Sequence, residues 1–179
     1  MSTAMVPEVS PGMSPAELEF LFREHYQLVY RTAYSITGTR QDAEDVLQTI
    51  FLRLLKRESL PDLKPNPERY LYRSAVNSAL TIIRTRQRQR LTDGVENLEI
   101  LSPDETRNGN EEIEQHLIDA MAQLPPQTVE ILILRYEHNY SDAEIAKMLR
   151  KSRTTIAVAL YRARARLRKL LRATLGEKL

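Results

Sequence analysis

Apolar residues recur at intervals of three and four along every long segment of this chain. That spacing places them on one face of an α-helix. The stretch 18–36 shows the pattern, and 43–55, 113–121, 129–136 and 156–171 repeat it. No segment alternates apolar and polar residues over a useful length, and five glycines among 179 residues argue against a turn-rich β protein. The spacing therefore predicts an all-α fold.

Start and stop signals divide this pattern into separate helices. Residues 14–17 read Ser-Pro-Ala-Glu, in which Ser caps a helix, Pro takes its first position and Glu closes a capping box. Gly38 can end that helix, and Thr39 can cap the next. Asn66 precedes the Pro and Glu that begin a third helix, which we expect to run to about Arg90.

A break in composition divides the chain into two parts. Residues 92–110 contain two glycines, a proline and many acids, which is typical of a flexible linker. We therefore predict two small helical domains, at 14–91 and 111–179, joined by a flexible acidic linker at 92–110. Residues 1–13 are small, polar and proline-containing, and we expect them to be a disordered tail.

Charge is distributed unevenly, although its net value is only +2. Arginines cluster at 84–90 and again at 150–172, and acids fill the stretch between them. Separated blocks of opposite sign favour surfaces that bind a polyanion. Either basic block alone fits a solvated helix face equally well.

The stretch 141–171 has the pattern of a helix-turn-helix. Ser141 and Glu144 form a capping box before a short helix, and a three-residue turn follows it. Ile156 begins the apolar stripe of a long second helix, and arginines flank the opposite face. A helix of this kind can enter the major groove of DNA with its first turns. The alternative is an amphipathic bundle helix with a solvated basic face.

Several classes of function are disfavoured by what the sequence lacks. It contains no cysteine, its three histidines lack ligand spacing, and it has no glycine-rich phosphate loop. We therefore expect no catalytic residues, no metal and no cofactor. No apolar run is long enough for a membrane span, and the first residues do not form a secretory signal. An intracellular protein without membrane insertion is the expectation.

Three segments resemble the extracytoplasmic-function (ECF) sigma factors, which are promoter-recognition subunits of bacterial RNA polymerase. Residues 42–53, DAEDVLQTIFLR, resemble the helix that docks on the clamp helices of the polymerase's largest subunit. Residues 70–77, YLYRSAVN, resemble the helix that melts and reads the downstream, minus-ten promoter element.

The third segment lies in the second half of the chain. Leu124-Pro125, Glu144-Ile145-Ala146 and the YRAR at 161–164 resemble the domain that reads the upstream, minus-thirty-five element. All three segments stand in the order that the family has, with the linker between the second and the third. The resemblance covers nearly everything from Pro15 to Leu171.

This resemblance implies roles for three sets of residues. Downstream-element contacts are implied for Tyr70, Tyr72, Arg73, Asn77, Arg84, Arg86 and Arg88. Upstream-element contacts are implied for Arg153, Thr154, Thr155, Ala157, Val158, Tyr161, Arg162 and Arg164. Polymerase contacts are implied for Asp42, Glu44, Asp45, Gln48 and Phe51.

The chemistry of these residue types suits such roles, and each has an alternative. Asn77 can pair with a base edge, or bond backbone within a bundle. Tyr70 and Tyr72 can stack on unpaired bases or lie in the core. The arginines can contact phosphates. The acids around Asp42 suit a basic partner helix, or simply the positive end of their own helix.

Three positions depart from the family's pattern. Arg150-Lys151 occupy the turn where the family usually has Gly and an apolar residue. Ala157-Val158-Ala159 stand where the family presents polar or basic side chains, so direct base readout is weakened and shape or phosphate contacts gain weight. Thr49 replaces an acid that is frequent in the clamp-binding helix.

The resemblance implies bacterial core RNA polymerase and promoter DNA as partners, an anti-sigma factor as regulator, and a cytoplasmic location. Two other functions stay open from the sequence. One is a sigma-like decoy that binds an anti-sigma protein and never engages DNA. The other is a helix-turn-helix regulator that binds duplex DNA without polymerase.

Overall fold

The fold consists of seven helices within the described residues, which are 14–56, 66–92 and 109–175 of a computed structural model. The expected tail at 1–13 and nearly all of the expected linker lie outside these residues. No strand occurs in the described ranges, so the all-α prediction is confirmed. In chain order the helices are α1 (Pro15–Thr37), α2 (Arg40–Leu55), α3 (Pro67–Thr92), α4 (Gly109–Ala122), α5 (Pro126–Tyr136), α6 (Asp142–Leu149) and α7 (Arg153–Leu175).

Local signals fix the ends of the first helices as the sequence predicts. The Ser14 hydroxyl accepts from the Glu17 backbone at 3.2 Å, and the Glu17 carboxylate accepts from the Ser14 backbone at 2.8 Å. Gly38 ends α1 with a φ of 74°, a left-handed conformation that glycine adopts without a steric penalty. Thr39 caps α2 by accepting from the Asp42 backbone.

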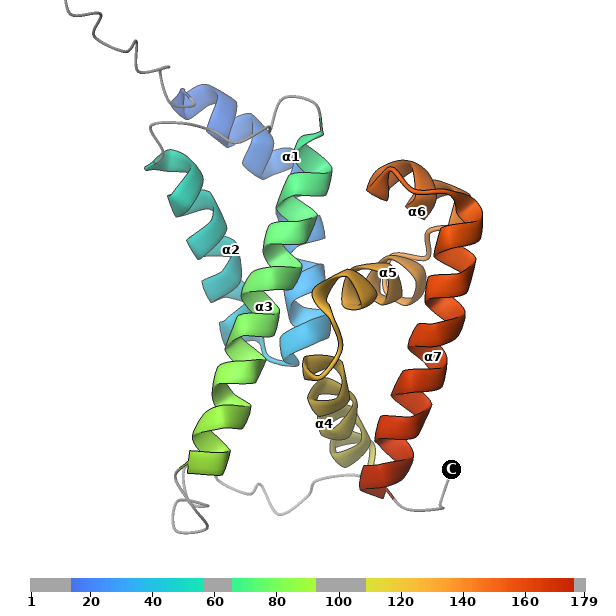
Figure 1. Cartoon of the computed structure of the whole chain (residues 1–179). Coiled ribbons are helices and arrows are strands. Elements are labelled where there is room, and N and C mark those ends of the chain that lie inside the picture. Colours follow the sequence, from blue (N-terminus) through green and yellow to red (C-terminus); the bar gives the residue numbers. More distant parts are fainter. Residues whose placement is uncertain (1–13, 57–65, 93–108, 176–179) are drawn as a thin grey trace, which may run out of the picture.

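The first three helices form a three-helix bundle, which we call the N-terminal unit (Figure 1). α1 packs against both α2 and α3, and α2 packs against α3. Val29, Ile36, Val46, Leu71 and Leu80 are among its fully buried side chains. Val29, Ile36 and Val46 lie on the apolar stripes of the sequence, so the stripes predicted the faces of α1 and α2 that turn inward.

The last four helices form the C-terminal unit. α7 packs against α4, α5 and α6 and runs along the outer edge of the molecule (Figure 1). Leu134, Ile145, Ile156 and Leu160 are buried between these helices. None of the helices in the described part is both long and apolar enough to cross a membrane.

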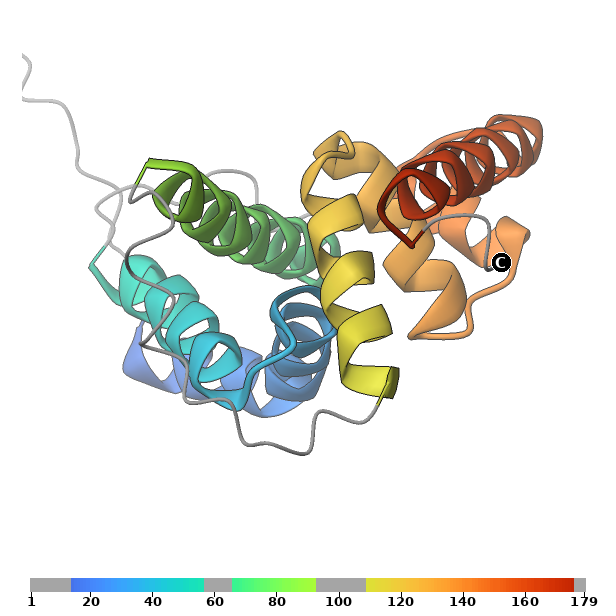
Figure 2. The same cartoon turned by 90° about the horizontal axis from the view of Figure 1, so that it is seen from below.

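The two units are packed together. Seen from below, α4 lies between the N-terminal unit and α7, and it contacts α1 and α3 (Figure 2). α5 also packs on α3, and one apolar cluster includes residues from both units. At Gly38 the approach is so close that a Cβ atom would lie 2.6 Å from Cδ1 of Ile118. The sequence predicted the units but not this closed arrangement.

Candidate polymerase and promoter interfaces

The connection between α6 and α7 has the geometry of a helix-turn-helix. Ser141 and Glu144 form the expected capping box at the start of α6. Arg150 ends that helix in the left-handed region, with a φ of 53°. Ser152 then accepts from the Thr155 backbone at 3.0 Å and so caps α7. Ile156 is completely buried, which holds the start of α7 against α6.

The residues that the resemblance assigns to the upstream element all lie on α7, most of them on the face that carries Val158 and Tyr161. All eight are exposed, including Tyr161 at 71% and Val158 at 42%. Near the turn, Thr154, Thr155, Val158 and Arg162 line a shallow depression. The middle of this face is apolar, because Ala157 and Val158 offer no hydrogen-bonding side chains. The arrangement suits phosphate contacts at the sides and methyl contacts in the centre.

Arg162 and Arg164 lie on different sides of α7. Two residues along a helix rotate the side chain by about 200°. Arg162 joins the depression near the turn, whereas Arg164 lines an apolar groove with Leu117 and Leu167, between α4 and α7. Arg162 is therefore the better placed of the two for DNA docked on the turn.

We expect Arg162→Ala to weaken binding of duplex DNA to nearly the same degree on every sequence. Loss of one phosphate contact reduces the slope of log K against log salt by about 0.9. Binding isotherms across a series of salt concentrations measure this slope. Arg164→Ala is the matched control and should change the slope less. An unchanged slope for Arg162→Ala would remove this residue from the interface.

Some of the residues assigned to the downstream element are exposed, and others are bonded to groups within the chain. Asn77 and Arg88 are exposed on α3, and Tyr70 is half-buried. Arg86 is paired with Asp42 of α2. Arg84 donates from Nε to the carbonyl of Ala122 at 2.9 Å and from Nη2 to that of Leu124 at 2.8 Å, so it joins the two units.

Tyr72 lies in the core rather than on a base-stacking surface. It is completely buried, and its hydroxyl donates to the backbone carbonyl of Glu130 on α5. Burial raises the pKa of this phenol well above its ordinary value. In the closed arrangement Tyr72 therefore takes the core position, which is one of its two alternatives, and Tyr70 is the tyrosine of the pair that reaches the surface.

The residues assigned to polymerase divide in a similar way. Glu44, Asp45 and Gln48 are exposed on α2, where a basic partner helix can reach them. Asp42 is 5% exposed and bonds the Thr39 hydroxyl as well as Arg86, so its contacts lie within the chain. Phe51 is buried and packs edge-on against Phe22 at 5.0 Å between ring centroids. Asp42 and Phe51 thus hold α2 in place instead of facing a partner.

Glu130 is the buried acid at the centre of the contact between the units. It is 4% exposed and accepts from Nε of Arg73 at 3.0 Å. Burial raises the pKa of its carboxyl, and the charge of Arg73 opposes that shift. Arg73, assigned to the downstream element, is thereby engaged with α5. Removal of Arg73 would leave the buried carboxylate of Glu130 without its partner, which is costly.

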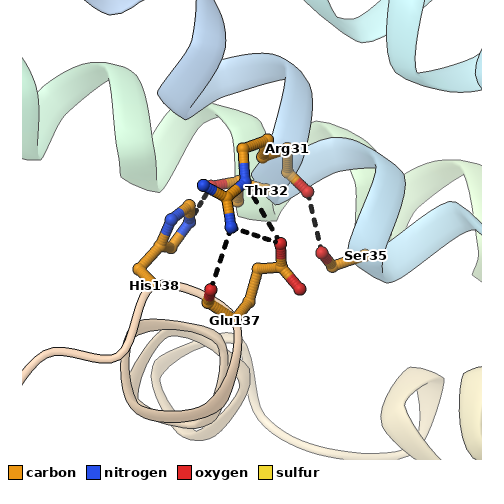
Figure 3. Close-up of polar contacts among 5 residues, drawn as sticks. All are labelled: Arg31, Thr32, Ser35, Glu137 and His138. Carbon is orange, nitrogen blue, oxygen red and sulfur yellow. Dashed lines mark hydrogen bonds and ion pairs between the residues drawn. The ribbon is translucent and has the colours of Figure 1, made fainter.

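A second polar cluster joins the end of α5 to α1 (Figure 3). The guanidinium of Arg31 donates to the Glu137 carboxylate at 3.0 Å and to the Glu137 carbonyl at 3.1 Å. A hydrogen bond of 2.9 Å joins the hydroxyl of Thr32 to Nε2 of His138. Burial is the main reason that the pKa of His138 lies below its ordinary value of 6.5, and the charge of Arg31 lowers it further.

His138 should make the folded chain less stable in mild acid. Its pKa is lowered by folding, so the unfolded chain binds more protons once the pH falls below the ordinary value of 6.5. We expect the free energy of unfolding to decrease between about pH 7.5 and pH 5.5. Urea titrations at both pH values measure the decrease.

His138→Gln is the matched variant, because its amide can still bond Thr32 but does not titrate. Glu130 acts in the opposite sense, since its pKa is raised in the folded chain. The difference between the wild type and His138→Gln at the two pH values therefore isolates the histidine. Equal pH dependence in both proteins would show that His138 does not contribute.

Glu130 and His138 were missed by the sequence interpretation. Glu130 does leave a signal, since it is the one charge inside the run VEILIL at 129–134. An acid at such a position is buried with a partner or exposed at a kink. The partner comes from another unit, so the sequence cannot name it.

Among the described residues no group of three or more His, Cys, Asp or Glu is arranged to hold a metal ion.

Comparisons with known proteins agree with this arrangement. Residues 21–89 match the model of sigma-70 region 2, and residues 114–167 match that of sigma-70 region 4. The first match covers most of the N-terminal unit and the second most of the C-terminal unit.

Several curated relatives are 30% identical to the chain, and two of them illustrate the match. One is the ECF RNA polymerase sigma factor SigE of Mycolicibacterium smegmatis, aligned over 84% of this chain and 60% of the relative. The other is the RNA polymerase sigma factor SigV of Bacillus subtilis, aligned over 78% of this chain and 82% of the relative. The chain thus spans less than two thirds of SigE and most of SigV.

A solved structure shares the fold. It is the sigma factor RpoE of Bartonella quintana in complex with the anti-sigma factor NepR, with a TM-score of 0.50 and 22% identity. The alignment covers 87% of this chain and 97% of RpoE.

Proposed function

Because the chain belongs to the ECF sigma factors of bacterial RNA polymerase, we propose that it binds core polymerase and directs promoter recognition, DNA melting and transcription initiation. One observation carries the proposal. The chain combines both promoter-binding regions of the family, in the family's order, and presents an exposed helix face for DNA in the second. It is an initiation factor and not an enzyme.

Each unit has its own task in this proposal. The exposed residues Glu44, Asp45 and Gln48 of α2 bind the clamp helices of polymerase. Asn77 and Tyr70 of α3 capture the melted downstream element. The exposed face of α7 grips the upstream duplex, with Arg162 and Arg153 on phosphates. We place this activity in the cytoplasm, where polymerase works.

The units have to separate before the downstream element can be read in full. Tyr72, Arg73 and Arg84 are among the residues assigned to that element, and all three bond the C-terminal unit in the closed arrangement. Binding to polymerase supplies the differential affinity that shifts the equilibrium toward an open form. The closed form is then the resting state of the free protein.

An anti-sigma factor is the regulator that we propose for this resting state. RpoE, which has the same fold, was solved with the anti-sigma factor NepR. A groove between α4, α5 and α7 offers a surface for such a partner in this chain, lined by apolar side chains and edged by arginines. The proposal of a partner rests on that likeness and on the groove.

Electrophoretic mobility shifts with and without core polymerase test the proposed function. We expect specific promoter binding only when polymerase is present. Specific binding of duplex by the chain alone would favour a conventional helix-turn-helix regulator. A chain that binds an anti-sigma protein but neither polymerase nor promoter would be a decoy.

A further inference from the structure

A polar cavity of about 390 Å³ lies where the first half of α3 faces the turn between α6 and α7. It is formed by both units, because five lining residues come from the first half of α3, one directly precedes that helix and one comes from the turn. The lining residues are Asn66, Arg69, Tyr70, Arg73, Ser74, Asn77 and Arg150. Cavities that hold small ligands begin at roughly 300 Å³, so this one has room for a single nucleotide.

Three guanidinium groups line this cavity, and no lining residue is acidic. Glu130 neutralises one of them, Arg73, from α5. The Nε atom of Arg69 is buried and has no hydrogen-bond partner. A buried donor without a partner carries a desolvation penalty, and in native proteins it is usually satisfied by another group or a ligand. The cavity is therefore lined by unneutralised positive charge, and one of its arginines, Arg69, carries a buried donor without a partner.

Arg150 lies in a backbone conformation that is unfavourable for arginine. Its φ of 53° is shared by only one other non-glycine residue in the described part of the chain, Asn139 at 57°. Asparagine tolerates this region, whereas for other L-residues it costs about 1 kcal/mol or more. Glycine at this position would remove the strain. The backbone of Arg150 is strained, and its side chain lines a cavity with two other arginines. Strain at such a position indicates a role for the guanidinium group.

We propose that this cavity binds a free nucleotide, whose phosphate groups bond Arg69 and Arg150. Guanidinium groups suit phosphate because their paired donors match its oxygens. The other lining groups suit the remainder of a nucleotide. Tyr70 supplies an aromatic face for a base, and the amides of Asn66 and Asn77 supply donors and acceptors for its edge.

Such a ligand would connect the two units. Arg69 belongs to the N-terminal unit and Arg150 to the C-terminal unit, so the complete site exists only in the closed arrangement. A ligand that binds one state shifts the equilibrium toward it. Nucleotide binding would therefore hold the free protein closed and would cover Asn77.

Calorimetric titration of the full-length chain with ADP tests this site at physiological salt, without polymerase. We expect saturable binding to the wild type. Arg150→Gly should raise the dissociation constant about tenfold or more, because one charge-assisted hydrogen bond is lost. This variant relieves backbone strain, so its fold should be at least as stable as that of the wild type.

Asn139→Gly is the matched control. It relieves the same kind of strain at a residue that does not line the cavity, so its ADP affinity should equal that of the wild type. Absence of saturable ADP binding by the wild type would overturn the proposal. Equal affinity of Arg150→Gly and the wild type would overturn it as well.

Two further titrants identify what the cavity recognises. Inorganic pyrophosphate should compete with ADP and bind more weakly, since it lacks the base. A short single-stranded DNA tests the other source of phosphate. If the DNA binds in an Arg150-dependent way while ADP and pyrophosphate do not, the free-nucleotide proposal is wrong. Polymerase is absent throughout, so these outcomes are independent of initiation activity.

Discussion

Asn77→Ala is expected to impair promoter opening strongly while leaving the affinity for core polymerase unchanged. Asn77 is exposed on α3, whereas its neighbour Val76 is buried in the core. The amide of Asn77 can bond a base edge in a bidentate manner. Such a pair contributes about 1–3 kcal/mol, so open complexes should decrease roughly 5- to 150-fold. Permanganate footprinting of the melted region measures the open complex, and co-elution measures polymerase binding.

Thr81→Ala provides the matched control for this prediction. Thr81 is exposed one turn further along α3, and its hydroxyl donates to the backbone carbonyl of Asn77. It lines the same shallow surface as Asn77 but has no assigned base contact. We expect normal opening with Thr81→Ala. Normal opening with Asn77→Ala would remove Asn77 from the reading of the downstream element.

Locking the two units together is expected to eliminate initiation. The chain has no cysteine, so Arg31→Cys and Glu137→Cys introduce its only two thiols. They replace an ion pair that joins α1 to the end of α5, with side chains 56% and 35% exposed. Ion pairs that are this exposed contribute about 1 kcal/mol or less, so the double variant should fold. After joining with a short bismaleimide, promoter-directed transcription should fall to background.

A bismaleimide cross-link within one helix is the control for the cross-link between the two units. Arg23 and Glu19 form an exposed ion pair one turn apart on α1. Joining cysteines at these two positions leaves the units free to separate, and we expect full activity. The uncross-linked Arg31→Cys, Glu137→Cys protein should also be active. Full activity of the cross-linked protein would show that the closed arrangement does not need to open.

The helices were predictable from sequence because the signals for them are local. The capping box at Ser14, the glycine at 38 and the capping box at Ser141 each act within four residues. The apolar stripes identified the inward faces of α1 and α7, since spacing alone determines which side chains share a face. The described helices begin and end close to where these signals stand.

The contact between the units was not predictable, because helical spacing says which face is apolar and not what covers it. Arg73 and Arg84 are good examples. In a basic sequence both suit phosphate contacts, yet the structure uses them to bond Glu130 and the carbonyls at the end of α4. Tyr72 was ambiguous for the same reason, since an aromatic residue serves equally in a core and on a base.

The exposure of the assigned residues was better predicted on α7 than on α2 or α3. Exposure of the α7 face follows from the position of Ile156 on the opposite side, which sequence spacing determines. Asp42 was different, because the arginine that neutralises it lies on another helix. Which exposed residues contact polymerase or DNA stays a prediction.

In vitro transcription with purified core polymerase on a library of promoter fragments tests the central claim most directly. We expect transcripts from defined start sites that appear only when this chain is added, and whose upstream sequences share two elements. A chain that does not associate with core polymerase would contradict the account. Association without any defined start site would contradict it equally.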